Sequence, residues 1–282
     1  MKSIATEKAK HLRSFDLSCA LHVLQRLFPD SQIEQLSKLD KGLSNHNFYF
    51  KLDAKPCLLK AFNGAVPVTA LNAQNALAQQ QVSQAILCLD RIDNVAVLEF
   101  LTAVQAPICL EEQIPKLLSG IHSLSVEKSS QLNLKGAILE ASSFLEQTWL
   151  GEYLIDELSA LPSDICFCHN DLVQDNVLNT PHGVRMLDFE YAQYNDSFFD
   201  LAAICCSYQL NEKQRQALLE RYFFYRRSPN PDNSIYKLDV FRGIYLLVSI
   251  AWYKQKNINT EMEMLEKQFK PWCRQHNLVY AS

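Results

Sequence analysis

Hydrophobic positions in the first third of the chain change period several times, and each change predicts a different element. Between residues 10 and 29 the apolar side chains follow helical spacing, and the pattern stops near Phe28 and Pro29. Short runs of β-prone residues come next, and the resulting strands are expected at 32–39, 47–52, 56–62 and 94–101. A helix over 68–88 is expected to interrupt them. This region therefore predicts a small sheet accompanied by helices.

Helical periodicity dominates the rest of the chain. We expect helices at 110–126, 137–161, 199–208, 212–224, 235–254 and 262–272. Three short apolar runs predict strands at 165–168, 177–178 and 184–187, and the last two turn around Pro181-His182-Gly183. The pattern predicts a second region that is mostly helical and has a few short strands near its middle.

Acidic and amide side chains gather beside these short strands. Asp171 follows the first strand, Asn176 lies five residues further on, and Asp188 follows the hairpin. A strand pair of this kind can hold the three side chains near one point. Because hard divalent cations such as Mg²⁺ prefer oxygen ligands, the cluster predicts an oxygen-rich cation site.

The spacing His-x-Asp-x-x-x-x-Asn followed by Asp-Phe resembles the catalytic and metal loops of protein-kinase-like phosphotransferases. His169–Leu172 and Asp188–Tyr191 resemble the small-molecule branch, which includes choline, ethanolamine and thiamine kinases and aminoglycoside phosphotransferases. Phe199–Ala202 is most similar to the choline-kinase side of that branch. The resemblance implies an α+β, protein-kinase-like fold of two lobes. A small antiparallel-sheet N-lobe is expected at 1–101, and a larger, mostly helical C-lobe at 102–282.

The resemblance also implies a function. It indicates ATP- and Mg²⁺-dependent phosphorylation of the hydroxyl of a small cationic alcohol, and choline or ethanolamine is the favoured acceptor. Thiamine is the first alternative and an aminoglycoside the second. A nucleotide-binding pseudokinase and a binding protein for cationic ligands that takes no nucleotide also stay open.

Site residues follow from matching the motifs position by position. Asp171 would accept or orient the proton of the acceptor hydroxyl. Asn176 and Asp188 would hold Mg²⁺, while His169 and Asp200 would brace the catalytic loop. The resemblance thus places the proposed base and the metal ligands on two loops.

Nucleotide-binding residues are expected in the first lobe. The turn at Gly42–Asn47 resembles a nucleotide-covering loop, so the backbone of Ser44 and Asn45 would face phosphate oxygens. Lys60 resembles the strand lysine that contacts the α- and β-phosphates. The backbone of Glu99 and Leu101 would meet adenine.

One feature departs from the family pattern. The helix that follows Lys60 should carry an acidic partner for it, yet no Asp or Glu occurs between Asp53 and Asp90. Gln74 or Asn75 would then hold Lys60 by a neutral hydrogen bond, or another carboxylate would. The pseudokinase alternative rests on this absence.

Aromatic residues provide candidates for the acceptor site. Cationic groups bind over aromatic faces, commonly beside a carboxylate. The candidates are Glu190, Tyr191, Tyr245, Trp252 and Tyr253. Core packing is the simpler explanation for each aromatic taken alone.

Composition narrows the remaining possibilities. A net charge of −4 gives no indication of a nucleic-acid or anionic-membrane partner. The polar N-terminus does not resemble a secretory signal and no apolar run approaches ~20 residues, so a cytoplasmic location without membrane association is expected. The nine cysteines are expected to be reduced. We expect no metal site at Cys166–His169, because no second ligand pair has zinc-site spacing.

Overall fold

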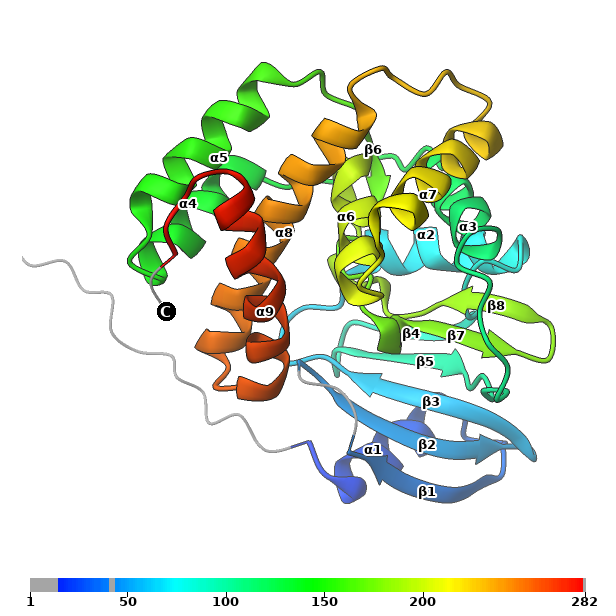
Figure 1. Cartoon of the computed structure of the whole chain (residues 1–282). Helices are drawn as coiled ribbons and strands as arrows, with labels where there is room; N and C mark the ends of the chain where they lie inside the picture. The colour runs from blue at the N-terminus through cyan, green and yellow to red at the C-terminus, as the bar shows by residue number, and fades with distance from the viewer. Residues whose placement is uncertain (1–14, 41–43, 281–282) are drawn as a thin grey trace, which may run out of the picture. The chain divides into compact units, whose positions relative to one another are not determined.

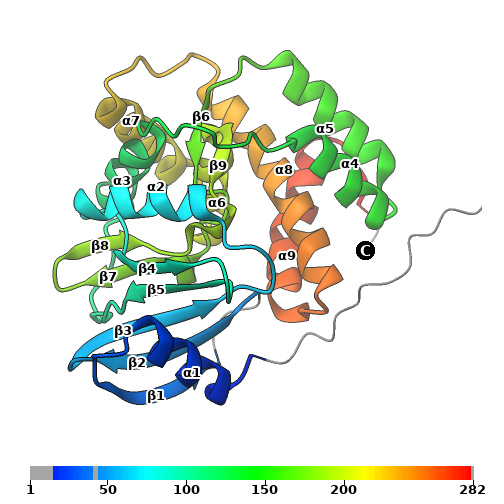
Figure 2. The ribbon, with the colours of Figure 1, turned by 180° about the vertical axis from the view of Figure 1, so that it is seen from behind.

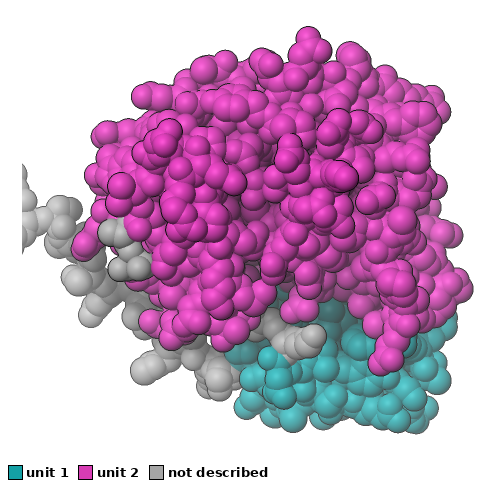
Figure 3. All heavy atoms as spheres, viewed as in Figure 1, with its two compact units in different colours: residues 1–68, 84–102 teal, residues 69–83, 103–282 magenta. Residues whose placement is uncertain are grey.

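The computed structural model describes residues 15–40 and 44–280. The chain divides into two compact units, coloured separately in Figure 3. The first comprises residues 1–68 and 84–102, and the second comprises 69–83 and 103–282. The segment 69–83 thus groups with the second unit, while the division into lobes after residue 101 stays a prediction.

The first unit consists of a helix and a five-stranded antiparallel sheet with strand order β1-β2-β3-β5-β4 (Figure 1). Its elements are α1 (Leu17–Leu27), β1 (Ile33–Leu39), β2 (His46–Leu52), β3 (Lys55–Ala61), β4 (Ile86–Asp90) and β5 (Val95–Glu99). Asp16 caps α1 by accepting a hydrogen bond from Cys19 N at 2.9 Å. The buried side chains Phe48, Phe50 and Leu59 of the sheet share one core with Leu24 of α1.

The predicted helix over 68–88 is wrong beyond its first half. The helix α2 covers Val68–Gln79, and the chain then enters strand β4, which pairs with β5. Residues 86–89 read Ile-Leu-Cys-Leu, and their apolar side chains also fit the helical repeat. Pairing with β5 makes this segment a strand and not a helix. The hydrophobic period along the sequence contains no information about that partner strand.

The second unit is mostly helical and carries two small two-stranded sheets. Its elements are α2 (Val68–Gln79), α3 (Gln113–His122), α4 (Leu134–Phe144), α5 (Thr148–Ala160), β6 (Ile165–Cys168), β7 (Val177–Thr180), β8 (Gly183–Met186), β9 (Gln193–Asp196), α6 (Ser197–Ser207), α7 (Glu212–Arg226), α8 (Ser234–Gln255) and α9 (Asn259–Gln275). β6 pairs with β9, and β7 with β8. The strand β9 was not expected, and the single helix predicted over 137–161 is two helices separated by a turn in which Glu146 has φ 58°.

Helix α8 is the centre of the second unit. Figures 1 and 2 show α9 running beside it, and α6 and α4 also pack against it. Phe241, Ile244 and Leu247 are completely buried along α8. At Gly243 a Cβ atom would collide with the indole of Trp272 on α9, so the close approach of the two helices requires glycine there.

The antiparallel sheet of the first unit and the helical second unit agree with the predicted α+β class. Across the described ranges, no helix combines the length and the apolar character that crossing a bilayer requires.

Candidate active site

The predicted catalytic loop begins where β6 ends. Cys168 of β6 pairs with Gln193 of β9, and the chain then turns through His169 and Asn170 to Asp171. The β6–β9 ladder therefore fixes the direction in which the loop leaves the core.

A buried carboxylate holds the start of this loop. Asp200, in the first turn of α6, is 0% exposed and accepts hydrogen bonds from His169 N at 2.7 Å and Asn170 N at 2.8 Å. His122 of α3 lies 3.1 Å from the same carboxylate through Nε2. Burial alone raises the pKa of Asp200, but its hydrogen bond to His122 and the charges of His122 and His169 outweigh burial and lower that pKa.

His169 and Asn170 tie the loop to the segment that follows the hairpin. His169 Nε2 lies 2.7 Å from Leu187 O, and its Nδ1 lies 3.3 Å from Asp171 N. Asn170, at φ 66°, donates through Nδ2 to Tyr191 O at 3.1 Å. Sequence reasoning missed Asn170 because its function depends on that left-handed backbone and on distant carbonyls. The two loops are consequently one connected structure.

Asp171, Asn176 and Asp188 meet at this connection. Asn176 donates through Nδ2 to Asp171 O at 2.8 Å and to Asp171 Oδ2 at 3.0 Å, and its own carbonyl accepts from Leu187 N at 2.8 Å. Asp188 takes the left-handed conformation with φ 63° directly after Leu187. The structure therefore brings together the three oxygen-bearing residues that the sequence placed near one point.

The pKa of Asp171 reflects this crowding. Partial burial is the main cause that raises it, and the carboxylates Asp188 and Glu190 raise it further. The charge of His169 and the hydrogen bond from Asn176 oppose them, and the resulting pKa is about 6. Glu190 thus belongs to the same electrostatic cluster.

Two of the predicted aromatic residues lie in reach of the Asp171 charge. Burial is the main cause that raises the pKa of Tyr253, to about 12, and the negative charge of Asp171 adds to it. Burial and then Cys206 raise the pKa of Tyr245, and Asp171 contributes there as well. Tyr245 is only 5% exposed and packs edge-on against Phe199, so it is mainly a core residue.

The other two predicted aromatics are Trp252, which contacts another side chain of α8, and Tyr191, which is exposed. Trp252 contacts Tyr253 edge-on with ring centroids 5.0 Å apart, and Lys256 Nζ lies 5.8 Å from the Trp252 ring. Tyr191 is 42% exposed, in the short turn after Asp188. Tyr253 is both partly exposed and within the electrostatic range of Asp171.

Asn176 and Asp188 offer the oxygen donors that Mg²⁺ prefers. Because the Asn176 amide nitrogen is directed at Asp171, its oxygen Oδ1 is the atom that would face a cation. The donor chemistry therefore fits the predicted ion.

The predicted nucleotide-binding residues lie in the first unit. Lys60 of β3 is 6% exposed, and its Nζ lies 5.4 Å from the ring centroid of Phe62. Asn63 donates to both Ser44 O and Asn45 Oδ1, so this turn is held against the end of β3. Of the predicted covering loop, Gly42 and Leu43 lie outside the described residues.

The segment after β5 carries the residues expected to meet adenine. The Glu99 carbonyl accepts from Gln84 Nε2 at 2.9 Å, and Glu99 N donates to Ala85 O at 3.0 Å. Leu101 follows two residues later, after the strand has ended. The assignment of both to adenine stays a prediction.

Helix α2 contains no acidic residue. Gln74 is 0% exposed, and its carbonyl accepts from Ser83 Oγ at 2.6 Å, while Asn75 is half-buried. Whether either amide holds Lys60 stays a prediction.

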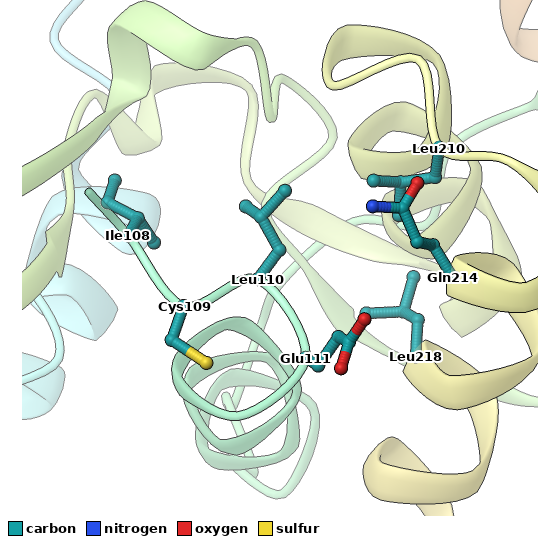
Figure 4. Close-up of a pocket in the computed structure, with 7 residues that line it drawn as sticks. All are labelled: Ile108, Cys109, Leu110, Glu111, Leu210, Gln214 and Leu218. Atoms are coloured by element: carbon teal, nitrogen blue, oxygen red, sulfur yellow. The ribbon is translucent and has the colours of Figure 1, made fainter.

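A separate small hollow lies between the segment before α3 and helix α7 (Figure 4). Ile108, Leu110, Leu210 and Leu218 give it apolar walls, and its volume is about 210 Å³. It contains none of the predicted site residues, so we assign it no role in the chemistry.

The antiparallel sheet, the helical unit and the His-Asn-Asp loop joined to an Asp-Phe turn define a protein-kinase-like fold. Within that class the chain belongs to the choline/ethanolamine kinase family, whose model matches residues 15–280. The match confirms the resemblance seen in the two motifs.

Individual relatives agree with this assignment. Protein LicA of Haemophilus influenzae is 33% identical over 97 residues, a match that spans 33% of this chain and 34% of that protein. About two thirds of the relative's length thus lies outside the match. The crystal structure of choline kinase LicA from Streptococcus pneumoniae has a TM-score of 0.74 at 18% identity, covering 91% of this chain and 98% of that one. A structure of LicA in complex with AMP has a TM-score of 0.68 at 17% identity, covering 89% and 98%.

Proposed function

We propose that the chain is an ATP- and Mg²⁺-dependent kinase that phosphorylates the hydroxyl of a small cationic alcohol, with choline or ethanolamine favoured. The observation that carries the proposal is the cluster of Asp171, Asn176 and Asp188, in which Asn176 Nδ2 lies 3.0 Å from Asp171 Oδ2. Family membership and the likeness to an AMP complex support nucleotide binding.

Asp171 is the proposed catalytic residue. Phosphoryl transfer depends mainly on positioning and charge stabilisation, so Asp171 would orient the acceptor hydroxyl and take up its proton. A pKa of about 6 leaves the carboxylate ionised at neutral pH, and it also makes Asp171 a better base than an ordinary aspartate. His169 and Asp200 would keep it in place through the bonds described above.

Asn176 and Asp188 are proposed to hold Mg²⁺. The ion would neutralise charge on the nucleotide phosphates. On the chain itself, Lys60 would add positive charge toward the phosphates, and the backbone of Ser44 and Asn45 would cover them. Neutralisation of this kind supplies much of the rate in phosphoryl transfer, because the protein does little covalent chemistry.

The acceptor site is proposed beside Asp171. Tyr253 and Trp252 would offer ring faces to the cationic group, with Tyr191 and Tyr245 completing the wall and Glu190 supplying a counter-charge. Choline, ethanolamine and thiamine each combine a positive group with a hydroxyl, so all three suit such a site. Choline and ethanolamine are preferred because the family match points to them.

The deciding experiment is acceptor-dependent ADP formation with Mg-ATP. The panel contains choline, ethanolamine, thiamine and an aminoglycoside, and Asp171→Asn is assayed beside the native chain. Asp175→Asn is the matched control, because it removes the same charge from an exposed residue in the same loop. Turnover on one cationic alcohol that persists in the control and disappears in Asp171→Asn supports the proposal. Turnover only on the aminoglycoside overturns the choice of acceptor.

A nucleotide-binding pseudokinase is the second candidate, favoured by the absence of any acidic residue on α2. It predicts that Mg-ATP binds and protects the chain from heat, while no acceptor yields ADP. Turnover that depends on Asp171 excludes it.

A further inference from the structure

The strand that leads into the catalytic loop also contributes to a second cluster. Cys166 and Cys168 of β6 are both buried, and their sulfur atoms lie 3.7 Å apart. A ring nitrogen of His122, which ends α3 and is 4% exposed, completes a set of three donor atoms within 4.8 Å of one another. Among the described residues this is the only group of at least three His, Cys, Asp or Glu side chains with such spacing. We propose that His122, Cys166 and Cys168 bind one zinc ion.

The distances suit a tetrahedral zinc site. With Zn–S near 2.3 Å and Zn–N near 2.0 Å, tetrahedral angles place two sulfur ligands about 3.8 Å apart and a sulfur and a nitrogen about 3.5 Å apart. The two sulfurs already have this separation, and the histidine nitrogen, which lies within 4.8 Å of both, needs to approach by no more than about 1.3 Å. Residues two apart on a strand share a face, so the β6–β9 ladder orients both cysteines.

His122 is already oriented as a metal ligand requires. Its Nε2 lies 3.1 Å from Asp200 Oδ2, and its Nδ1 lies 2.8 Å from Tyr222 Oη. Metal-binding histidines usually donate their other N–H to a carboxylate, which fixes the ring and increases its basicity. With Asp200 in that role, Nδ1 is the ligand atom. Tyr222 Oη accepts a hydrogen bond from Arg226 Nη1 at 2.8 Å and has a second lone pair for the fourth position.

Charge balance also favours a divalent ion. Binding Zn²⁺ forms two Zn–S bonds and one Zn–N bond, while the Cys166 and Cys168 thiols release two protons to solvent and a protonated His122 releases the proton on Nδ1. Two thiolates, a neutral imidazole and a hydroxyl around Zn²⁺ have no net charge, which makes the complex compatible with burial. The nearby cation Arg226 is paired with Asp164, so it does not leave a positive charge unmatched beside the ion.

Such an ion would support the proposed catalytic loop indirectly. His122 holds Asp200, and Asp200 holds the backbone of His169 and Asn170. A zinc ion that fixes the His122 ring would therefore stiffen the attachment of the loop. We expected no metal site at Cys166–His169 because the sequence has no second ligand pair with zinc-site spacing. The third donor in the structure is His122, which comes from the distant helix α3.

Metal content of the full chain tests the proposal. The protein is reduced with a phosphine, given one equivalent of Zn²⁺, desalted and measured by native mass spectrometry and elemental analysis. Cys166→Val is compared with Cys57→Val, the same change at a buried strand cysteine outside the cluster. We expect one zinc in the native chain and in Cys57→Val, and an affinity more than about 100-fold lower in Cys166→Val, since losing a ligand exceeds the loss of an outer partner. Zinc should raise the melting temperature of the native chain and of Cys57→Val, and should leave that of Cys166→Val unchanged.

Cobalt provides a readout that does not depend on a variant. Co²⁺ added to the native chain should give thiolate-to-cobalt charge-transfer absorption, and its absence overturns the proposal even if Cys166→Val fails to fold. Equal zinc in native and Cys166→Val protein also overturns it. So does a reduced native chain that retains no zinc after desalting.

Discussion

Replacing Asp171 by asparagine is expected to abolish phosphotransfer and, in the same step, to stabilise the metal-free protein. Partial burial, together with the carboxylates Asp188 and Glu190, raises the pKa of Asp171 from 3.8 to about 6. The charged form of this carboxylate is therefore less stable in the folded chain than in the unfolded chain. Asparagine has the same shape, cannot ionise, and retains an oxygen to accept the bond from Asn176.

The size of the gain follows from the pKa. A raised pKa in the folded state contributes stability that is complete below the unfolded value and disappears as the pH rises through the folded value. A shift of about 2 units corresponds to about 3 kcal/mol, so Asp171→Asn should gain about 3 kcal/mol near pH 8 and roughly half of that near pH 5. For a chain of this size the gain near pH 8 is a rise of about 6 °C or more in melting temperature.

Thermal unfolding in a chelating buffer, measured between about pH 5 and 8, tests this reasoning. Asp175→Asn is again the control, because that carboxylate is exposed and its removal should leave the pH profile close to native. A gain for Asp171→Asn that is the same at both ends of the range, or no gain near pH 8, would refute the electrostatic account. Loss of activity without stabilisation would keep Asp171 as the catalytic residue but contradict the electrostatic destabilisation assigned to its ionised form.

Three further substitutions probe the cluster and its support. Asp188→Asn should lower kcat/KM roughly 100-fold and increase the Mg²⁺ needed for half-maximal rate, and kinetics with native metal dependence would contradict its role. Tyr253→Leu should raise KM for the cationic acceptor about 10-fold with KM for ATP unchanged, whereas Tyr236→Leu, an exposed tyrosine on the same helix, should alter neither. Asp200→Asn should destabilise the fold by about 3 kcal/mol in urea unfolding, because a buried histidine and two N–H groups lose their charged acceptor, and an unchanged midpoint would argue against that bracing.

Sequence patterns predicted those elements whose local period decides the structure. The strands containing Phe50, Leu59 and Phe167 and the long apolar helix around Ile244 lie where the periodicity placed them. β4 was missed because an apolar run of Ile, Leu, Cys and Leu suits a helix as well as a strand, and only pairing with β5 decides. β9 was missed for the same kind of reason, since Gln193–Asp196 is polar and becomes a strand through its partner β6.

The sequence predicted those candidate site residues that lie at fixed spacings within the two motifs. Asp171, Asn176 and Asp188 are close enough in sequence for the motif to specify their meeting. The supporting contacts were not predictable, because His122 reaches Asp200 from another helix. Asn170 reaches the carbonyls after the hairpin only through a left-handed backbone. Spacing predicts which groups would carry the chemistry, whereas tertiary packing determines which residues hold those groups in place.

The contrast between Asp171 and Asp200 explains how the loop tolerates a disfavoured charge. Asp200 is more deeply buried than Asp171, yet its pKa is lowered, because a histidine and two backbone N–H groups offset burial. Asp171 has one side-chain donor, Asn176, and faces two further carboxylates, so its pKa is raised. If the loop were free to move, Asp171 would turn toward water and relieve this repulsion. His169 N and Asn170 N donate to the Asp200 carboxylate, and these bonds fix the backbone directly before Asp171, so that it stays beside Asp188 and Glu190. A divalent cation bound there would neutralise that repulsion, and the cluster would therefore be more stable with an ion than without one.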